Sequence, residues 1–211
     1  MSETGAEANG ASLFPHSLET DRLELERLCH DTVDIFACYR RRSRHEPAIE
    51  EVTEYLPWDP HETVGETADY VDGFERKWAD GVRAEYLLRP RAGEEDAGDV
   101  AGSACLIVDW ETRTATPGIW LRKRFWGQGY AAERARALAE LAFERLDMEL
   151  FAVPVEDGNG KSRAAVSAYV ADLGGQYDGV VRNATVRPDG RVVDRHRYTV
   201  TREQYEAATG D

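Results

Sequence analysis

The chain has 211 residues, and its 40 Asp and Glu against 26 Lys and Arg give a formal net charge of −14. No apolar run approaches the roughly 18 residues of a membrane span, which excludes a transmembrane protein, and the acidic balance argues against a nucleic-acid binder. The first 12 residues lack the basic region and apolar core of a secretory signal. We therefore expect a cytoplasmic protein with no membrane or direct nucleic-acid partner.

The basic residues are almost all arginine, since only Lys77, Lys123 and Lys161 are lysine. Abundant carboxylates with so few lysines favour a halophilic protein, because high salt screens the repulsion among like charges. An ordinary acidic protein from a GC-rich genome is the alternative interpretation.

Cysteine and histidine are sparse and scattered. Cys29, Cys38 and Cys105 contain no C-x-x-C pair, and the five histidines show no metal-ligand spacing. We therefore predict reduced, mostly buried thiols and no metal site.

The first third of the chain is predicted to contain one strand followed by helices. Residues 1–16 are small, polar and glycine-containing, which is typical of a flexible tail ahead of a single domain over 17–211. Alternating apolar and polar residues over 20–28 predict a half-buried strand. Helical spacing predicts helices over 31–44, 47–55 and 62–80.

The apolar period then changes to that of strands, which predicts an antiparallel meander. Its strands are expected over 83–89 and 100–110, with a third through Ile119–Leu121. An alanine-rich helix is predicted over 130–146. A strand over 150–155, a helix over 161–173 and final strands over 177–186 and 191–200 complete the expected elements.

The segment from Leu121 to Glu133 carries the clearest chemical signal. A strand ends, a basic turn with Gly127 and Gly129 follows, and a long helix begins. Glycines permit positive φ angles and close backbone approach, and the first turn of a helix offers unpaired N–H groups to an anion. The turn therefore suits a pyrophosphate, although a strand-to-helix turn with glycines for geometry alone is the alternative. The segment is not a dinucleotide fingerprint, because a full G-x-G-x-x-G is absent.

The sequence around this turn resembles the GNAT acyltransferases. Arg124-x-x-Gly127-x-Gly129 matches their R/Q-x-x-G-x-G/A signature, and the flanking Gly118–Leu121 and Trp126–Ala131 are similar to the RimJ/RimL branch of ribosomal-protein N-terminal acetyltransferases. Further segments of the same branch follow in order. They are Leu18–Leu23, Tyr55–Trp58, Asn159-x-x-Ser162, Leu173-Gly174 and Asp178-Gly179.

The resemblance implies an α+β GNAT fold, with a mixed, mostly antiparallel sheet flanked by helices that opens where acetyl-CoA enters. It also implies a set of donor-binding residues. The backbone of Trp120, Leu121 and Arg122 would pair with pantetheine, and Arg124 with the N–H groups of Gly127, Gln128, Gly129, Tyr130 and Ala131 would hold the pyrophosphate. Asn159 would contact pantetheine near the thioester, and Ser162 would lie by the sulfur and protonate the leaving thiolate.

Four candidate site residues keep a purely structural alternative. Asn159 and Ser162 also fit a helix start, with the asparagine as its cap. Tyr169, seven residues beyond Ser162, is an alternative acid or a buried packing tyrosine. Trp58 is expected either in the acceptor pocket or as a loop anchor in the core.

The chain departs from the branch where a general base is expected. No glutamate stands near Thr116 and no carboxylate near Thr185. Glu111, Asp109 and His196 are candidates only by expected proximity. A bound water or an already neutral amine would also serve.

The expected function is transfer of an acetyl group from acetyl-CoA to a primary amine, directly and without a covalent enzyme intermediate. The resemblance favours a protein N-terminal α-amine as the acceptor, such as that of a ribosomal protein. A small-molecule amine, such as a polyamine or an antibiotic, and a non-catalytic acyl-CoA-binding sensor are the alternatives. A monomer and a homodimer both fit the sequence.

Overall fold

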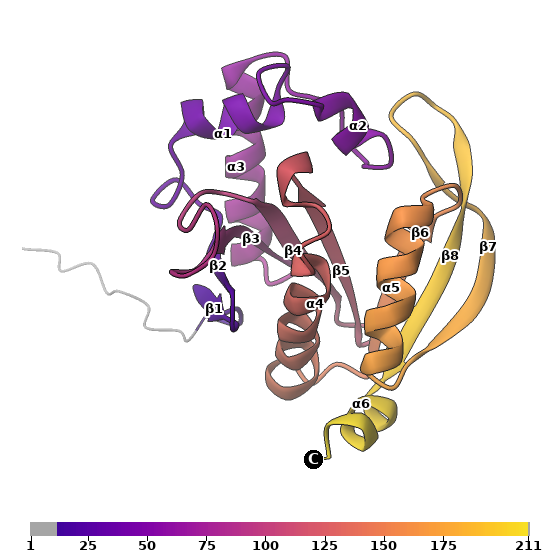
Figure 1. Ribbon diagram of the computed structural model, residues 1–211. Coiled ribbons are helices and arrows are strands. Elements are labelled where there is room, and N and C mark those ends of the chain that lie inside the picture. Colours follow the sequence, from indigo (N-terminus) through magenta and orange to yellow (C-terminus); the bar gives the residue numbers. More distant parts are fainter. Residues whose placement is uncertain (1–11, 211) are drawn as a thin grey trace, which may run out of the picture.

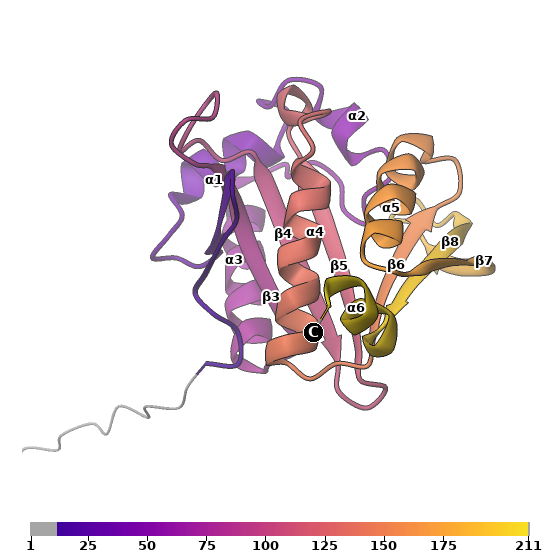
Figure 2. The same cartoon turned by 60° about the horizontal axis from the view of Figure 1, so that its bottom comes forward.

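The structure is a computed structural model that describes residues 12–210. Eight strands form one open sheet with helices on both faces (Figures 1 and 2). The strands are β1 (Ser17–Glu19), β2 (Leu23–Arg27), β3 (Arg83–Pro90), β4 (Gly102–Asp109), β5 (Thr114–Leu121), β6 (Leu150–Glu156), β7 (Gln176–Val186) and β8 (Val192–Thr201). The helices are α1 (Ile35–Arg42), α2 (Ile49–Thr53), α3 (Val64–Ala79), α4 (Tyr130–Glu140), α5 (Gly160–Asp172) and α6 (Arg202–Thr209).

The sheet has the order β1-β2-β3-β4-β5-β6-β8-β7. All neighbouring strands are antiparallel except β5 and β6, which run parallel. The expected mixed, mostly antiparallel sheet flanked by helices is therefore confirmed.

The two faces of the sheet are buried by different helices. Side chains alternate between the faces of a strand, and Ala84, Tyr86 and Leu88 of β3 join the large core cluster that contains the apolar residues of α4 and α5. Leu87, on the opposite face, packs with Val71 and other residues of α3. The sheet thus separates an α4–α5 side from an α1–α3 side.

The sheet opens between β5 and β6. These strands pair only through Thr114 with Leu150 and Ala115 with Phe151, after which no further register continues between them. Pro117 pairs with Leu106 of β4 but lies beyond the part of β5 that pairs with β6, so on that side the missing N–H of proline costs no ladder hydrogen bond. Figure 1 shows β5 diverging from β6, with α4 and α5 on either side of the gap.

The expected strand over 20–28 is shorter in the structure, where it forms β2, and β1 lies ahead of it. Thr20 closes a turn between β1 and β2, because its N–H donates to the Leu23 carbonyl and its hydroxyl accepts from the Leu23 N–H, both at 2.9 Å. Helix α6 was not expected from the sequence. It begins with a capping box made by Thr201 and Gln204.

The expected tail over 1–16 lies largely outside the described residues. Its last part, 12–16, is packed against the domain and so corrects that expectation for these five residues. Phe14 is completely buried and lies 5.2 Å from the Trp78 ring, centroid to centroid. Arg145 donates to the carbonyls of Leu13 and Ser12 at 3.0 and 2.9 Å. Burial of a phenylalanine favours order here despite the polar neighbours.

Within residues 12–210, no helix combines the length and the apolar character needed to cross a bilayer.

Candidate active site

The glycine turn connects β5 to α4 at the open end of the gap. Gly127 and Gly129 have φ angles of +78° and +82°, in the region that side-chain-bearing residues rarely adopt. A Cβ added at Gly127 would meet nothing within 4 Å, so the surface above the turn is open. Both glycines are therefore required by backbone geometry, and the turn remains accessible.

The backbone amides of this turn have no internal acceptor. Among residues 12–210, none of the N–H groups from Gly127 to Ala131 donates a hydrogen bond, and Gly129 provides no side-chain cap for α4. The first intrahelical bonds come from Ala132 and Glu133 to the Gly129 carbonyl. Five free donors at the positive end of a helix form an anion site.

The turn is held from the β1–β2 side of the sheet. The Arg22 guanidinium donates to the Gln128 carbonyl at 2.9 Å and to Glu133 at 2.8 Å. Glu133 also accepts from the Thr20 hydroxyl at 2.5 Å and from the Arg22 N–H at 2.7 Å. Burial alone would raise the pKa of Glu133, but these hydrogen bonds and the Arg22 charge outweigh it and lower that pKa. We call this group of contacts, made by Thr20, Arg22 and Glu133, the anchor. The sequence did not predict it, although Thr20 and Arg22 lie in a segment that resembles the family.

The basic side chains of 122–124 are all paired with carboxylates. The pairs are Arg122 with Glu46 (2.9 Å) and Asp99 (3.0 Å), Lys123 with Glu51 (2.5 Å), and Arg124 with Asp99 and with Asp96 (3.4 Å). A phosphate at the turn must therefore compete with Asp99 for Arg124. The amides face no such competition.

The orientation of the backbone groups of β5 limits which of its residues face the gap. The Arg122 N–H donates to the Ala101 carbonyl at 2.9 Å, and backbone groups in antiparallel strands alternate sides. Trp120 and Arg122 therefore turn their backbone groups toward β4, whereas Ile119 and Leu121 face the gap. The Leu121 carbonyl accepts from the Trp126 indole at 2.9 Å. Of the three residues whose backbone was expected to pair with pantetheine, only Leu121 turns its backbone groups toward the gap. Ile119, which was not among them, does so as well.

The start of α5 lies across the gap from the turn. The Asn159 side chain caps this helix by accepting from the Ser162 N–H at 3.1 Å. Ser162 is half-buried in the first turn. Both residues therefore have the structural role foreseen as the alternative, which does not conflict with contact to a ligand.

Tyr169 belongs to the core. Its side chain is 1% exposed, and its hydroxyl finds no hydrogen-bond partner among the described residues. Burial raises the pKa of Tyr169, and the nearby Arg134 of α4 opposes that change. These features favour the packing interpretation of Tyr169 over an acid that exchanges protons.

Aromatic residues line the α1–α3 side of the β5 end. Trp58 lies 5.7 Å from Trp120, centroid to centroid, and both rings contact the Arg42 guanidinium at 4.8 and 4.7 Å. Trp120, Trp58 and Trp126 share one apolar cluster with residues of α2. Trp58 is thus both a packed residue and a neighbour of the β5 end.

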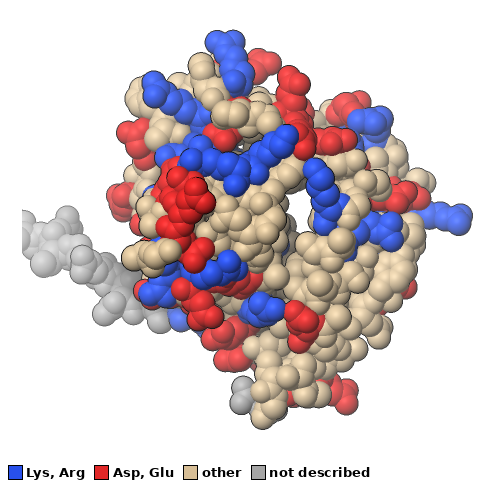
Figure 3. Space-filling view, viewed as in Figure 1, with Lys and Arg blue, Asp and Glu red and all other residues tan. Residues whose placement is uncertain are grey.

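The gap is open in the space-filling view. Figure 3 shows a hollow between β5 and α5 with Lys and Arg side chains along its rim. Glu51 of α2 contacts Lys123 and, at 3.4 Å, Lys161 at the start of α5. Carboxylate and lysines therefore link the two sides of the gap.

A family model for the acetyltransferase (GNAT) domain matches residues 22–169. The chain belongs to the GNAT acetyltransferases. It is therefore an acyltransferase enzyme, and its eight-stranded sheet is the GNAT fold. No curated protein matches the chain in sequence.

Several solved structures share this GNAT fold. A GCN5-related N-acetyltransferase from Brucella melitensis is 19% identical, with 92% of this chain and 82% of that chain covered and a TM-score of 0.74. RimL, a ribosomal α-N-protein acetyltransferase, is 19% identical, with 88% and 93% covered and a TM-score of 0.69. MccE, a microcin C7 self-immunity acetyltransferase in complex with acetyl-CoA and AMP, is 16% identical, with 91% and 99% covered and a TM-score of 0.71.

The candidate bases of this GNAT chain do not gather at the gap. Asp109 and Glu111 lie at the β4–β5 hairpin, at the opposite end of β5 from the glycine turn. His196 contacts Asp157 at 3.0 Å and Tyr177 at 2.9 Å, which occupy both of its ring nitrogens. The structure therefore assigns no base among these three.

Among residues 12–210, one group of side chains could hold a metal. The ligand atoms of His30, in the loop after β2, and of Asp72 and Glu75 on α3 lie within 4.8 Å of one another. Exposed acidic groups often cluster in this way, and none of the three is near the GNAT turn.

Proposed function

We propose that this GNAT acetyltransferase transfers the acetyl group of acetyl-CoA to the α-amine of a protein N-terminus. The observation that carries the proposal is the row of five free amides at the glycine turn, at the mouth of the gap between β5 and β6. Such a row fits the pyrophosphate of CoA. The gap beside it fits an extended pantetheine arm.

The residues of the chain divide the work of binding. The amides from Gly127 to Ala131 hold the pyrophosphate, and Arg124 joins them after leaving Asp99. The edge of β5 at Ile119 and Leu121 offers backbone groups to the amides of pantetheine. Asn159 and Ser162, at the start of α5, lie near the thioester.

The transfer step is a direct acyl exchange. The nitrogen lone pair of a neutral amine attacks the thioester carbonyl carbon, the C–N bond forms, and the C–S bond breaks. The sulfur leaves as a thiolate and takes the proton of the Ser162 hydroxyl, and the proton released by the new amide returns through water to Ser162, so that the serine ends as a hydroxyl and the products are the amide and the free thiol. A base is needed only in so far as the amine is protonated at the working pH.

The protein acceptor is favoured by two features. The fold resembles that of RimL, and the net charge of −14 attracts a cationic partner such as a basic ribosomal protein. A small-molecule amine is the second candidate, because the MccE fold is similar as well. A sensor that binds acyl-CoA without turnover is the third, and it is supported by the missing base.

Release of free CoA thiol from acetyl-CoA separates the three candidates. The acceptors are basic peptides with a free N-terminus, the same peptides with a blocked N-terminus, and spermidine. Turnover on free peptides alone supports the proposal, and turnover on spermidine alone supports a small acceptor. Binding of acetyl-CoA with no turnover on any acceptor supports the sensor. The Gly127→Glu variant reports background hydrolysis.

A further inference from the structure

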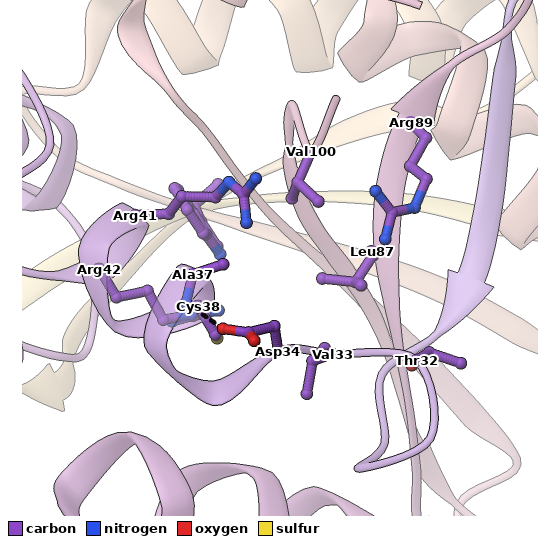
Figure 4. A pocket seen from close by; sticks show the side chains of 11 residues that line it. Thr32, Val33, Asp34, Ala37, Cys38, Arg41, Arg42, Leu87, Arg89 and Val100 are labelled. Carbon is purple, nitrogen blue, oxygen red and sulfur yellow. Dashed lines mark hydrogen bonds between the residues drawn. The ribbon is translucent and has the colours of Figure 1, made fainter. Parts of the chain in front are cut away.

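A cavity of about 230 Å³ lies between α1 and the sheet, apart from the glycine turn. Asp34, Cys38 and Arg41 line it from α1 and its cap, and Leu87 and Arg89 line it from β3. Figure 4 shows the guanidinium groups of Arg41 and Arg89 reaching the same space from opposite sides. The cavity therefore has two cationic walls.

The charge of this lining is unusual for so acidic a chain. Three arginines, Arg41, Arg42 and Arg89, line the cavity together with a single carboxylate, that of Asp34. The buried Arg42 guanidinium packs over the Trp120 ring and donates to the hydroxyls of Tyr70 and Ser103, which both contact the Glu85 carboxylate. The cationic groups that remain for a ligand are therefore those of Arg41 and Arg89.

Arg41 and Arg89 keep donors for a ligand. Arg41 contacts Asp99 through Nη2 at 3.2 Å, and Arg89 uses Nε on Glu26 at 2.9 Å and Nη1 on the Gly98 carbonyl. Neither carboxylate partner lines the cavity. Further N–H groups of both guanidinium forks are therefore left for an anion.

Most of the other lining residues are apolar. They are Val33, Ala37, Leu87, Val100 and Trp120, with Thr32 as the polar exception. A bare inorganic anion would leave this surface without a partner, whereas a ligand with an apolar body would cover it. We propose that this cavity binds a small organic acid, with its carboxylate between Arg41 and Arg89 and its apolar body against Val100 and Trp120. The planar arginine fork matches the geometry of a carboxylate.

The cavity is separate from the transfer centre but adjoins it. Its β3 wall lies two strand spacings, about 10 Å, from β5. Trp120 connects the two, because it lines the cavity and its ring also packs against Trp58. Asp99 contacts both Arg41 of the cavity and Arg124 of the turn. The inference does not depend on the proposed acetyl transfer, because binding can be measured without turnover.

Isothermal titration calorimetry on the full chain tests the proposal. The probes are benzoate and hexanoate, their neutral amides benzamide and hexanamide, and inorganic phosphate. We expect at least one acid to bind about tenfold or more tightly than its amide and than phosphate. Arg89→Gln and Arg41→Gln should each weaken that binding about tenfold, whereas the exposed Arg136→Gln, on α4, should leave it unchanged.

A second variant guards against misfolding of the arginine variants. Ala37→Phe fills the cavity and keeps all three arginines, so it should abolish acid binding while circular dichroism remains native. The proposal is overturned if neither acid binds, if acid and amide bind equally, or if phosphate binds as tightly as the acids. Retained binding in both Ala37→Phe and Arg89→Gln would also overturn it, because the acid would then bind elsewhere.

Discussion

The starts of α4 and α5 face each other across the gap in the sheet and differ in how their first amides are satisfied. At α5, Asn159 caps the helix with its side chain. At α4, Gly129 offers no side chain, and the amides from Gly127 to Ala131 have no acceptor among the described residues. A helix that is left uncapped and held in place from outside is prepared for an anion, whereas a helix that caps itself is not.

The two helix starts also differ in how far along the chain the residues that hold them lie. The α4 turn depends on Arg22 and Glu133, which are 111 residues apart in the chain. The α5 cap depends on two residues three positions apart. The local cap contributes stability to its own helix. The long-range anchor fixes the shape of a site.

The largest effect is expected from a carboxylate at the uncapped start. Gly127→Glu should weaken CoA binding about 100-fold or more, because the added charge lies against the phosphates. Gly127→Ala separates backbone strain at positive φ from charge and should lose far less affinity. The matched change at the capped start, Gly160→Glu, should cost less than about tenfold. Equal losses at Gly127 and Gly160, measured by calorimetry with CoA, would show that the two helix starts are equivalent.

The second-largest effect on CoA binding is expected from a change in the anchor. Glu133→Gln keeps the shape of the side chain but weakens its bonds to Thr20 and Arg22, which lowers the free energy of unfolding by about 1.5–3 kcal/mol. CoA affinity should fall about tenfold because the Gln128 carbonyl loses its fixed partner. Chemical denaturation and calorimetry measure the two effects. The exposed Glu140→Gln on the same helix is the control. An equal loss of CoA affinity in that variant would show that the anchor does not support the CoA site.

Removal of the cap should have a smaller and more local effect. Asn159→Ala should lower the free energy of unfolding by about 1 kcal/mol, because the Ser162 N–H loses its acceptor. Asn159→Ser restores a capping oxygen and should recover most of the loss. Urea denaturation measures the difference. No loss in the alanine variant would mean that α5 does not depend on its side-chain cap.

The smallest effect is expected in the stability of the protein at low pH. The folded state lowers the pKa of Glu133, so its contribution is complete above the ordinary value of about 4.3 and is lost as pH falls through the folded pKa. The stability difference between the native chain and Glu133→Gln should be constant from pH 7 to 5 and should shrink below about pH 4. Thermal melts across that range provide the measurement. A difference that already shrinks between pH 7 and 5 would contradict the lowered pKa.

Local patterns identified the elements around the site. The expected strand through Ile119–Leu121, the two glycines and the alanine-rich helix were predicted in the right order. The capping role of Asn159 was foreseen as well, since a cap depends on neighbours within one helical turn.

Long-range partners were not foreseen. The basic run of 122–124 was expected to face phosphate, yet its side chains pair with Glu46, Glu51 and Asp99, which are 23 to 76 residues away. The direction of the β5 backbone was also unknown, because alternation fixes which residues share a side but not which side β4 occupies. That choice turned Trp120 and Arg122 away from the gap.

The acidic composition, the order of elements and the glycine turn were determined by the sequence alone, because each depends on residue types or on neighbours a few positions apart. The gap beside the turn, the anchor from Arg22 and the arginine-lined cavity under α1 were decided by the tertiary structure. Each of these unites segments distant in the chain, and only the packing of strands and helices selects which charges meet and which amides remain free.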